Sequence, residues 1–124
     1  MKIIRTKKAK GSRLYSEGIL SGNFVFTGGK VGMDPKSGEV RKGITEQTKQ
    51  ALENVKEVLE AAGTSMRKVV RVMVFLTDMS DYDKMNEVYE KFFGDNPPAR
   101  FCVGVSKLAH PDLRVEIDAI AEAA

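Results

Sequence analysis

The chain contains no tryptophan, a single cysteine, a single histidine and no long apolar run. One cysteine, Cys102, can form neither an internal disulfide nor a cysteine-based zinc site, so we expect a reducing compartment. No stretch approaches the ~20 apolar residues that span a bilayer. Met1–Arg5 also lacks the apolar core of a signal peptide. The sequence therefore predicts a cytoplasmic protein without a membrane partner.

The 124 residues are 42% hydrophobic and 30% charged, a composition typical of one globular domain. A domain of this size buries roughly two-thirds of the surface that its unfolded chain exposes. A hydrophobic core can therefore form without disulfides or a structural metal. We predict a single domain over residues 1–124.

The basic side chains are unevenly distributed. The net charge is +3, yet residues 1–16 hold six basic and no acidic side chains, which leaves −3 for the rest. Such a segment could contact phosphates. Lysines around an edge strand explain it better, because positive charge discourages edge-to-edge pairing and no aromatic residue is interleaved to stack on bases. A nucleic-acid partner is therefore not expected. The basic residues are Lys2, Arg5, Lys7, Lys8, Lys10 and Arg13.

The first part of the chain combines short β patterns with one long helical pattern. After a short β-rich stretch from Ile3, Leu14–Leu20 and Phe24–Thr27 are predicted strands of a hairpin. Apolar residues at helical spacing predict a helix over Thr45–Ala62, with its first residue as N-cap and a glycine as its stop. Val69–Leu76 is apolar on both faces and predicts a central strand buried on two sides.

The second part of the chain predicts one more helix and two more strands. The helix begins at Ser80, whose hydroxyl caps it, and ends at Gly94. Arg100–Ser106 and Arg114–Ile120 alternate with a period of two, which predicts one core-facing side in each strand. The predicted core-facing residues are Phe101, Val103 and Val105 in the first strand and Val115, Ile117 and Ala119 in the second.

The resulting order βββ-α-β-α-ββ predicts an α+β two-layer sandwich. A mixed or largely antiparallel sheet would carry two helices on one face. The strand at Val69–Leu76 leaves little polar surface for the second sheet face. Because a large exposed apolar face is unusual in a monomer, we expect a closed homo-oligomer that covers it.

Arg100 is the most informative polar residue, and it shares one face of its predicted strand with Cys102. A partly buried guanidinium needs a partner. Glu116 or Asp118 on the neighbouring strand could neutralise it. Alternatively, the planar guanidinium of Arg100 could hold a ligand carboxylate through two parallel hydrogen bonds. The residue pattern alone leaves both interpretations open.

Other candidate residues carry weaker signals. Cys102 is interpreted as a buried thiol rather than a nucleophile, because no histidine lies near it in sequence. Tyr15 fits either the core or a site, and Glu116 fits either a water-orienting role or an ion pair. Gly28-Gly29-Lys30 lacks phosphate-loop spacing, but glycine there would expose a backbone amide. The isolated His110 is interpreted as a turn residue, and no metal site is predicted.

Several short motifs follow one another along nearly the whole chain. They are Tyr15-Ser16-Glu17-Gly18, Phe24–Pro35 with Ser37-Gly38-Glu39, Gln50–Val55 with Glu60–Gly63, Val74–Met79, Pro98-Ala99-Arg100 and Val115–Ala121. Together, and in this order, they resemble the RidA/YjgF family, whose best-known members are 2-iminobutanoate/2-iminopropanoate deaminases. The resemblance is specific because it covers the chain from end to end.

The resemblance implies a homotrimer of chorismate-mutase-like α+β subunits with ligand sites in the clefts between subunits. In the Pro-Ala-Arg motif, Arg100 would hold the carboxylate of a 2-imino or 2-oxo acid, and Glu116 would position the attacking water. The backbone at Gly29 and Cys102 would complete the carboxylate cradle, and Tyr15 would line the pocket. Two further positions match near the cleft, namely Asn86 and Tyr89.

The implied reaction is hydrolysis of an imine or enamine to a 2-oxo acid and ammonia, with neither a metal nor an organic cofactor. Gly28-Gly29-Lys30 stands where the family commonly has Ser-Gly-Gln, Arg13-Leu14 replaces a common Gly-Pro, and the loop at residues 108–113 is one residue longer. These departures leave the choice of substrate open. The alternatives are a non-catalytic trimer that binds small carboxylates and an endoribonuclease or translation inhibitor, an activity also attached to some family members.

Overall fold

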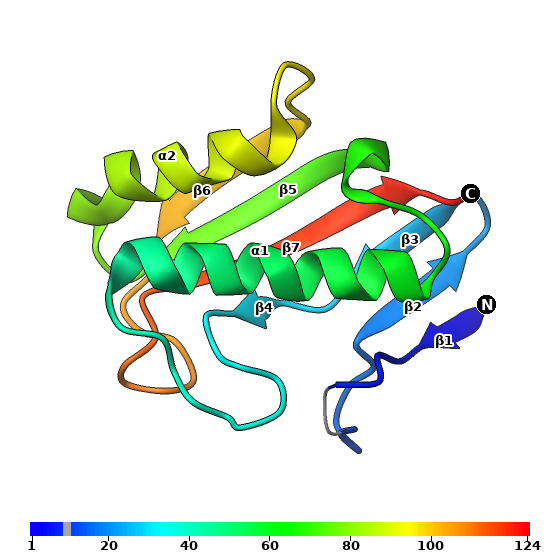
Figure 1. Ribbon diagram of the computed structural model, residues 1–124, viewed down its shortest axis with the longest axis horizontal. Coiled ribbons are helices and arrows are strands. Elements are labelled where there is room, and N and C mark those ends of the chain that lie inside the picture. Colours follow the sequence, from blue (N-terminus) through cyan, green and yellow to red (C-terminus); the bar gives the residue numbers. More distant parts are fainter. Residues whose placement is uncertain (9–10) are drawn as a thin grey trace.

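A seven-stranded sheet and two helices make up the computed structural model, which describes residues 1–8 and 11–124 (Figure 1). Both helices lie on the same face of the sheet, which confirms the predicted α+β two-layer architecture. The elements are β1 (Lys2–Ile4), β2 (Gly18–Ser21), β3 (Phe24–Thr27), β4 (Lys30–Val31), α1 (Gly43–Ala61), η1 (Met66–Lys68), β5 (Val69–Leu76), η2 (Met79–Asp81), α2 (Tyr82–Phe93), β6 (Ala99–Gly104) and β7 (Val115–Glu122).

The last strand, β7, occupies the middle of the sheet. The strand order is β1-β2-β3-β7-β5-β6, and β4 pairs with a separate part of β7. All pairings of β7 are antiparallel, whereas β5 and β6 are parallel because α2 carries the chain back between them. The sheet is therefore mixed, as predicted, and β1 and β6 are its two edges.

The helix-facing side of the sheet forms the hydrophobic core. Val72, Val74 and Leu76 of β5 and Ile117 of β7 are fully buried, at alternate positions along their strands. The apolar sides of α1 and α2 pack on these strand residues, and together they form one hydrophobic core cluster. The predicted bounds of β5 and the predicted core face of β7 are thus confirmed.

The other face of the sheet is largely apolar, although Arg71, Glu116 and Asp118 also lie on it, and the described residues leave it uncovered. Within one copy β5 is therefore buried on one side, and its other side belongs to the face that we expect a further copy of the chain to cover. Side chains on this open face are half-buried or exposed, and the strand registers place them together. The open face includes Ile3, Ile19, Phe24, Phe26, Met73, Phe75, Phe101, Val103 and Ile120.

The predicted orientation of β6 is wrong. Arg100 and Cys102 pair in register with the buried Val72 and Val74, so they point toward the helices. Phe101 lies on the open face, where it makes an edge-on ring contact with Phe75 at 5.9 Å between centroids. The apolar side of β6 is thus the side that its own chain leaves uncovered.

The N-terminal half also departs from the prediction in two places. Residues 14–17 lie outside any strand, so the hairpin begins only at Gly18. A short additional strand, β4, follows Gly29 and pairs with β7, which adds a fourth strand before the first helix. This pairing places Gly29 and Lys30 beside the middle of β7.

Both predicted helix N-caps are wrong. α1 begins at Gly43, two residues before Thr45, and its N-cap Lys42 makes no side-chain capping bond. Ser80 lies within η2, where its backbone N–H donates to the Asp78 carboxylate at 2.9 Å. Asp78 therefore caps η2, whereas the N-cap of α2 is Asp81, which makes no side-chain capping bond. The predicted ends hold, because Gly63 and Gly94 adopt positive φ directly after the two helices.

The basic N-terminal segment surrounds an edge strand, as predicted, because β1 is the first strand of the sheet. Lys8 is nevertheless held by Glu57 of α1, with 2.6 Å between Nζ and Oε1. Lys10 lies outside the described residues. Among the residues that the structure describes, no helix is long and apolar enough to cross a membrane.

Candidate functional site

Arg100 is held by three side chains of α2. Its Nη1 donates to Asn86 Oδ1 at 2.7 Å, and its Nη2 donates to the Tyr82 hydroxyl at 3.2 Å. The guanidinium carbon also lies 4.7 Å from the ring centroid of Tyr89, within the range of a cation–π contact. The three helix residues share one side of α2 because they are four and three positions apart. We call Arg100, Asn86, Tyr82, Tyr89 and Cys102 the arginine group.

The charge of Arg100 is not neutralised within the described part of the chain. None of the ion pairs found there includes it. The interpretation that Glu116 or Asp118 pairs with it is wrong, since these residues are in register with Phe75 and Met73 on the open face. A guanidinium has five N–H donors, and only two are used here. Arg100 is therefore a preoriented cation with donors left for a carboxylate.

Cys102 lies two residues after Arg100 on the same side of β6. Burial raises the pKa of its thiol, and the positive charge of Arg100 opposes this shift only in part. At neutral pH the side chain is thus a protonated thiol with little nucleophilic character. Since β6 is an edge strand, one side of its backbone has no strand partner. The backbone of Cys102 is thus at an edge that a ligand can reach.

Glu116 and Gly29 form a second group on the open side of the sheet. A Cβ atom at Gly29 would overlap the Glu116 carboxylate, so the two residues lie in direct contact. Burial raises the pKa of the Glu116 carboxyl, and the negative charge of Asp118 raises it further. Burial likewise raises the pKa of Asp118, against the charge of Arg71. We call Glu116, Gly29 and Asp118 the glutamate group.

Tyr15 belongs to neither the core nor a strand. It lies in the loop before β2, and 66% of its side chain is exposed. Together with Gly29 it lines a cavity of about 290 Å³. Tyr15 and Gly29, a member of the glutamate group, thus line the same cavity. Tyr15 does not contact Arg100 of the same chain.

The arginine and glutamate groups lie on opposite faces of one sheet. Arg100 points toward the helices from β6, and Glu116 points toward the open face from β7, with β5 between the two strands. A ligand small enough to be held by Arg100 cannot also touch Glu116 of the same copy. The predicted site residues are therefore gathered into two half-sites.

Two residues of these half-sites had no site role predicted from sequence. Tyr82 lies at the start of α2, and its spacing with Asn86 and Tyr89 was the available signal. Asp118 was considered only as an ion-pair partner, although it lies two residues from Glu116 on the same strand face. Its Oδ1 is buried and makes no hydrogen bond within the described residues.

No group of three metal-binding side chains occurs among the residues that the structure describes. His110, the only histidine of the chain, lies in the loop before β7, where its Nδ1 accepts a hydrogen bond from the Asp112 backbone at 3.1 Å. This local bond fits the turn role predicted for it. The chemistry of the two half-sites thus depends on Arg100 and Glu116.

Comparison with known proteins agrees with this arrangement of motifs. A family profile described as Endoribonuclease L-PSP matches residues 6–123. A RutC family protein of Pyrococcus horikoshii is 53% identical over 108 residues, which cover 86% of this chain and 85% of that protein. The human 2-iminobutanoate/2-iminopropanoate deaminase is 40% identical over 122 residues, which cover 97% of this chain and 88% of that protein.

The fold agrees equally well with a solved structure. The crystal structure of Escherichia coli TdcF with bound serine superposes with a TM-score of 0.94 at 38% identity, covering 100% of both chains. The profile, the sequence relatives and this structural match cover nearly the whole chain. The chain therefore belongs to the YjgF/RidA family, the family of the Endoribonuclease L-PSP profile.

Proposed function

We propose that this protein hydrolyses short 2-imino acids, such as 2-iminobutanoate and 2-iminopropanoate, to 2-oxo acids and ammonia. The observation that carries the proposal is Arg100, a half-buried guanidinium without an acidic partner in the described residues, fixed by Asn86 and Tyr82. Such a fork fits the carboxylate that every 2-imino acid carries. The name of the human relative, an imine deaminase, supports this choice of substrate class.

The complete site would form between copies of the chain, in a homotrimer. The arginine group of one copy would meet the glutamate group and Tyr15 of the next. The uncovered apolar face supports association, since such a face is rarely left in contact with water. Closed symmetry would repeat the same contact around the ring and give every copy one complete site.

The proposed mechanism uses Arg100 and Glu116 for different tasks. Arg100 holds the carboxylate and so fixes the imine carbon at C2. Glu116 accepts a proton from a water molecule whose oxygen attacks C2, while the imine nitrogen takes up a proton from solvent. The resulting carbinolamine collapses to the 2-oxo acid as the protonated Glu116 returns its proton to the leaving nitrogen, which departs as ammonia, and the carbinolamine hydroxyl releases its proton to solvent.

The direct test measures ammonia and 2-oxobutanoate release from freshly generated 2-iminobutanoate. We expect the wild-type protein to accelerate hydrolysis well above the uncatalysed rate. A folded protein that binds 2-oxobutanoate without accelerating ammonia release would instead select the alternative of a carboxylate-binding protein.

Activity should fall as the pH drops through the raised pKa of Glu116, because only the carboxylate accepts a proton. Asp118→Asn removes the negative charge that helps to raise this pKa. The pKa of Glu116 should then fall, and the acid limb of the kcat/KM profile should move to lower pH. Profiles for the wild type and the variant test this, and an unmoved limb would assign the proton acceptor to another group.

Gly29→Ala should lower turnover more than stability. The new methyl group would displace the Glu116 carboxylate, but the end of a glutamate side chain moves at little cost. We expect a loss of about tenfold or more in kcat, the scale of a misplaced general base, with little change in Tm. Gly11→Ala is the control, because its methyl group would meet only ordinary contacts. Equal activity of the two variants would separate Gly29 from the site.

The family profile's name also favours a second candidate, an endoribonuclease. The basic segment is its other support, although Glu57 already holds Lys8. RNA cleavage that persists in Arg100→Ala but disappears when Lys7 and Lys8 are neutralised would select this function. Its RNA affinity should then fall steeply with salt.

A further inference from the structure

A cavity of about 290 Å³ opens on the helix side of the sheet, and Gly29 of the glutamate group and Tyr15 are among its lining residues, whereas Glu116 is not. The residues that line it come from the 33–38 loop, α1, β4 and the N-terminal segment. Gly29 has its open side toward Glu116, and Lys30, the next residue of an extended strand, points to the other side. The paired strands β4 and β7 thus lie between the cavity and the Glu116 side chain. The volume of the cavity suits only a small ligand.

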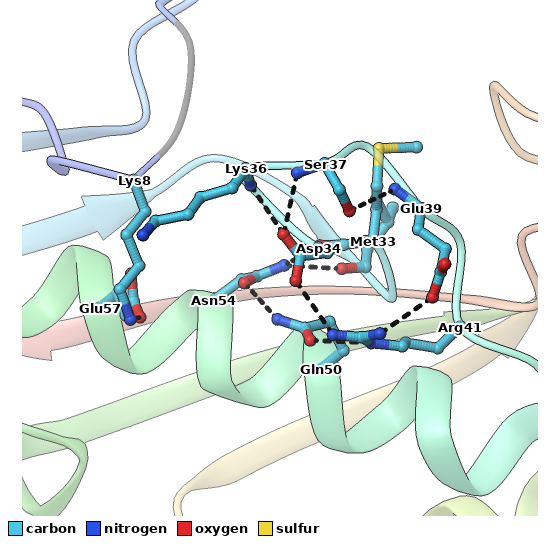
Figure 2. Close-up of polar contacts among 11 residues, drawn as sticks. Lys8, Met33, Asp34, Lys36, Ser37, Glu39, Arg41, Gln50, Asn54 and Glu57 are labelled. Atoms are coloured by element: carbon cyan, nitrogen blue, oxygen red, sulfur yellow. Dashed lines mark hydrogen bonds and ion pairs between the residues drawn. The ribbon is translucent and has the colours of Figure 1, made fainter.

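The outer wall of the cavity is fixed by a hydrogen-bond network (Figure 2). Asn54 of α1 donates to the carbonyl oxygens of Val31 and Met33 at 3.0 and 2.9 Å. Arg41 donates to Asp34 at 3.0 Å and to Gln50 at 3.2 Å, which ties the far end of the loop to the same helix. The cavity is therefore largely preformed and does not depend on a moving loop.

The acidic side chains that line the cavity are already neutralised. Asp34 accepts the backbone N–H groups of Lys36 and Ser37 and pairs with Arg41, and these bonds lower its pKa. Glu57 pairs with Lys8. Glu17 has 10% of its side chain exposed, accepts hydrogen bonds from the backbone and hydroxyl of Thr6, and has its cationic partner in Lys30, 3.6 Å away. The acids therefore leave little uncompensated negative charge facing the cavity.

The ammonium of Lys30 is a largely buried cation in the wall of the cavity. Its side chain is 15% exposed, and burial lowers its pKa against the opposing charge of Glu17. Its one partner among the described residues is Glu17, 3.6 Å away, which is longer than a hydrogen bond. An ammonium offers three donors, so a buried lysine with this single long contact favours a further anionic oxygen.

The mouth of the cavity adds a second positive charge and apolar surface. Figure 2 shows the Lys36 side chain extending beside Lys8, and the two lysines also line a neighbouring hollow. Val31, Met33 and Pro35 supply apolar lining close to Lys30. A ligand that uses both features carries a negative group at one end and a short hydrocarbon chain at the other.

We propose that this cavity binds the carboxylate of a short-chain organic acid, with Lys30 as its main donor and Lys36 as a second cation at the mouth. Arg100 is not part of this site. The site is built around Lys30 and does not include Glu116, although Gly29 and Tyr15 also line the cavity, so a small acid bound there would lie directly beside the glutamate group.

Titrating the ¹⁵N-labelled Arg100→Ala protein with butyrate tests the proposal, since this background removes the other carboxylate-binding group and needs no turnover. We expect saturable shifts of the amide signals of residues 29–38 and 54–57. Adding Lys30→Gln should weaken the apparent Kd by at least about tenfold, the value of a charge-assisted bond. Adding Lys49→Gln, an exposed lysine of α1 outside the cavity, should leave it unchanged.

Two comparisons complete the experiment. Butyramide, which has the same shape without the charge, should cause no saturable shift, and Lys36→Gln should weaken butyrate binding without affecting the fold, since its side chain is exposed. Lack of butyrate binding, equal binding by butyramide, or an unchanged Kd in both lysine variants would overturn the proposal. Tighter binding of inorganic phosphate would replace the organic acid by a phosphate ligand and overturn that assignment.

Discussion

Replacing Arg100 with alanine should abolish the acceleration of 2-iminobutanoate hydrolysis. The guanidinium is the group that would hold the substrate carboxylate, and two charge-assisted hydrogen bonds are together worth several kcal/mol. We expect kcat/KM to fall by at least about 100-fold, measured as ammonia release above the uncatalysed rate. The fold should survive, because Tyr82 and the edge strand β6 are exposed enough for water to replace the lost bonds.

Two further variants show whether the shape or only the charge of Arg100 matters. Arg100→Lys keeps the positive charge but loses the planar fork, so its activity should lie between those of the wild type and Arg100→Ala. Arg67→Ala removes an exposed arginine from η1 and should leave the rate unchanged. Wild-type turnover in Arg100→Ala would refute the role of this residue.

Two strands were predicted well from sequence, β7 from its alternating polarity and β5 from its long apolar run. From Val115 to Ala119, β7 alternates between apolar and acidic residues, and the apolar positions of this stretch are the buried ones. β5 was placed with its bounds because eight residues without glycine or proline form a largely apolar run. In both cases the local pattern and the buried surface belong to the same chain, so periodicity is sufficient.

β6 shows where periodicity fails. Its apolar residues, Phe101 and Val103, lie on the open face, and Arg100 and Cys102 face the helices. An apolar strand side indicates that this side is buried. It does not indicate whether the chain's own helices or another copy of the chain buries it. The parallel pairing of β5 with β6 decides the orientation, and this pairing follows from the path of α2 rather than from local residues.

The composition of the candidate site was predictable, but its division into two halves was not. The Pro-Ala-Arg motif of Arg100 and the strand that holds Glu116 are each a continuous run of residues, so each was recognised locally in the sequence. Their separation by the sheet depends on strand order, which places β5 between β6 and β7. The structure therefore excludes an ion pair between Arg100 and Glu116 of one copy, and the proposed site requires these two groups from different copies.

Mixing two inactive variants should restore activity if each site takes Arg100 from one copy and Glu116 from another. Arg100→Ala and Glu116→Gln should each be inactive alone, because every site then lacks one of the two groups. When the two chains are unfolded together and refolded as a mixture, some sites combine an intact Arg100 from one variant with an intact Glu116 from the other. Random association predicts recovery of about a quarter of the wild-type activity.

The control mixture contains Arg100→Ala and the double variant Arg100→Ala/Glu116→Gln, in which no copy supplies the arginine. It should remain inactive at any ratio, which excludes recovery through refolding alone. A mixture of the single variants that stays inactive, although size measurements show mixed assemblies, would place both groups of each site in one copy. Recovery that peaks at equal amounts would instead show that the sheet separates the two halves within a chain and that association completes the site.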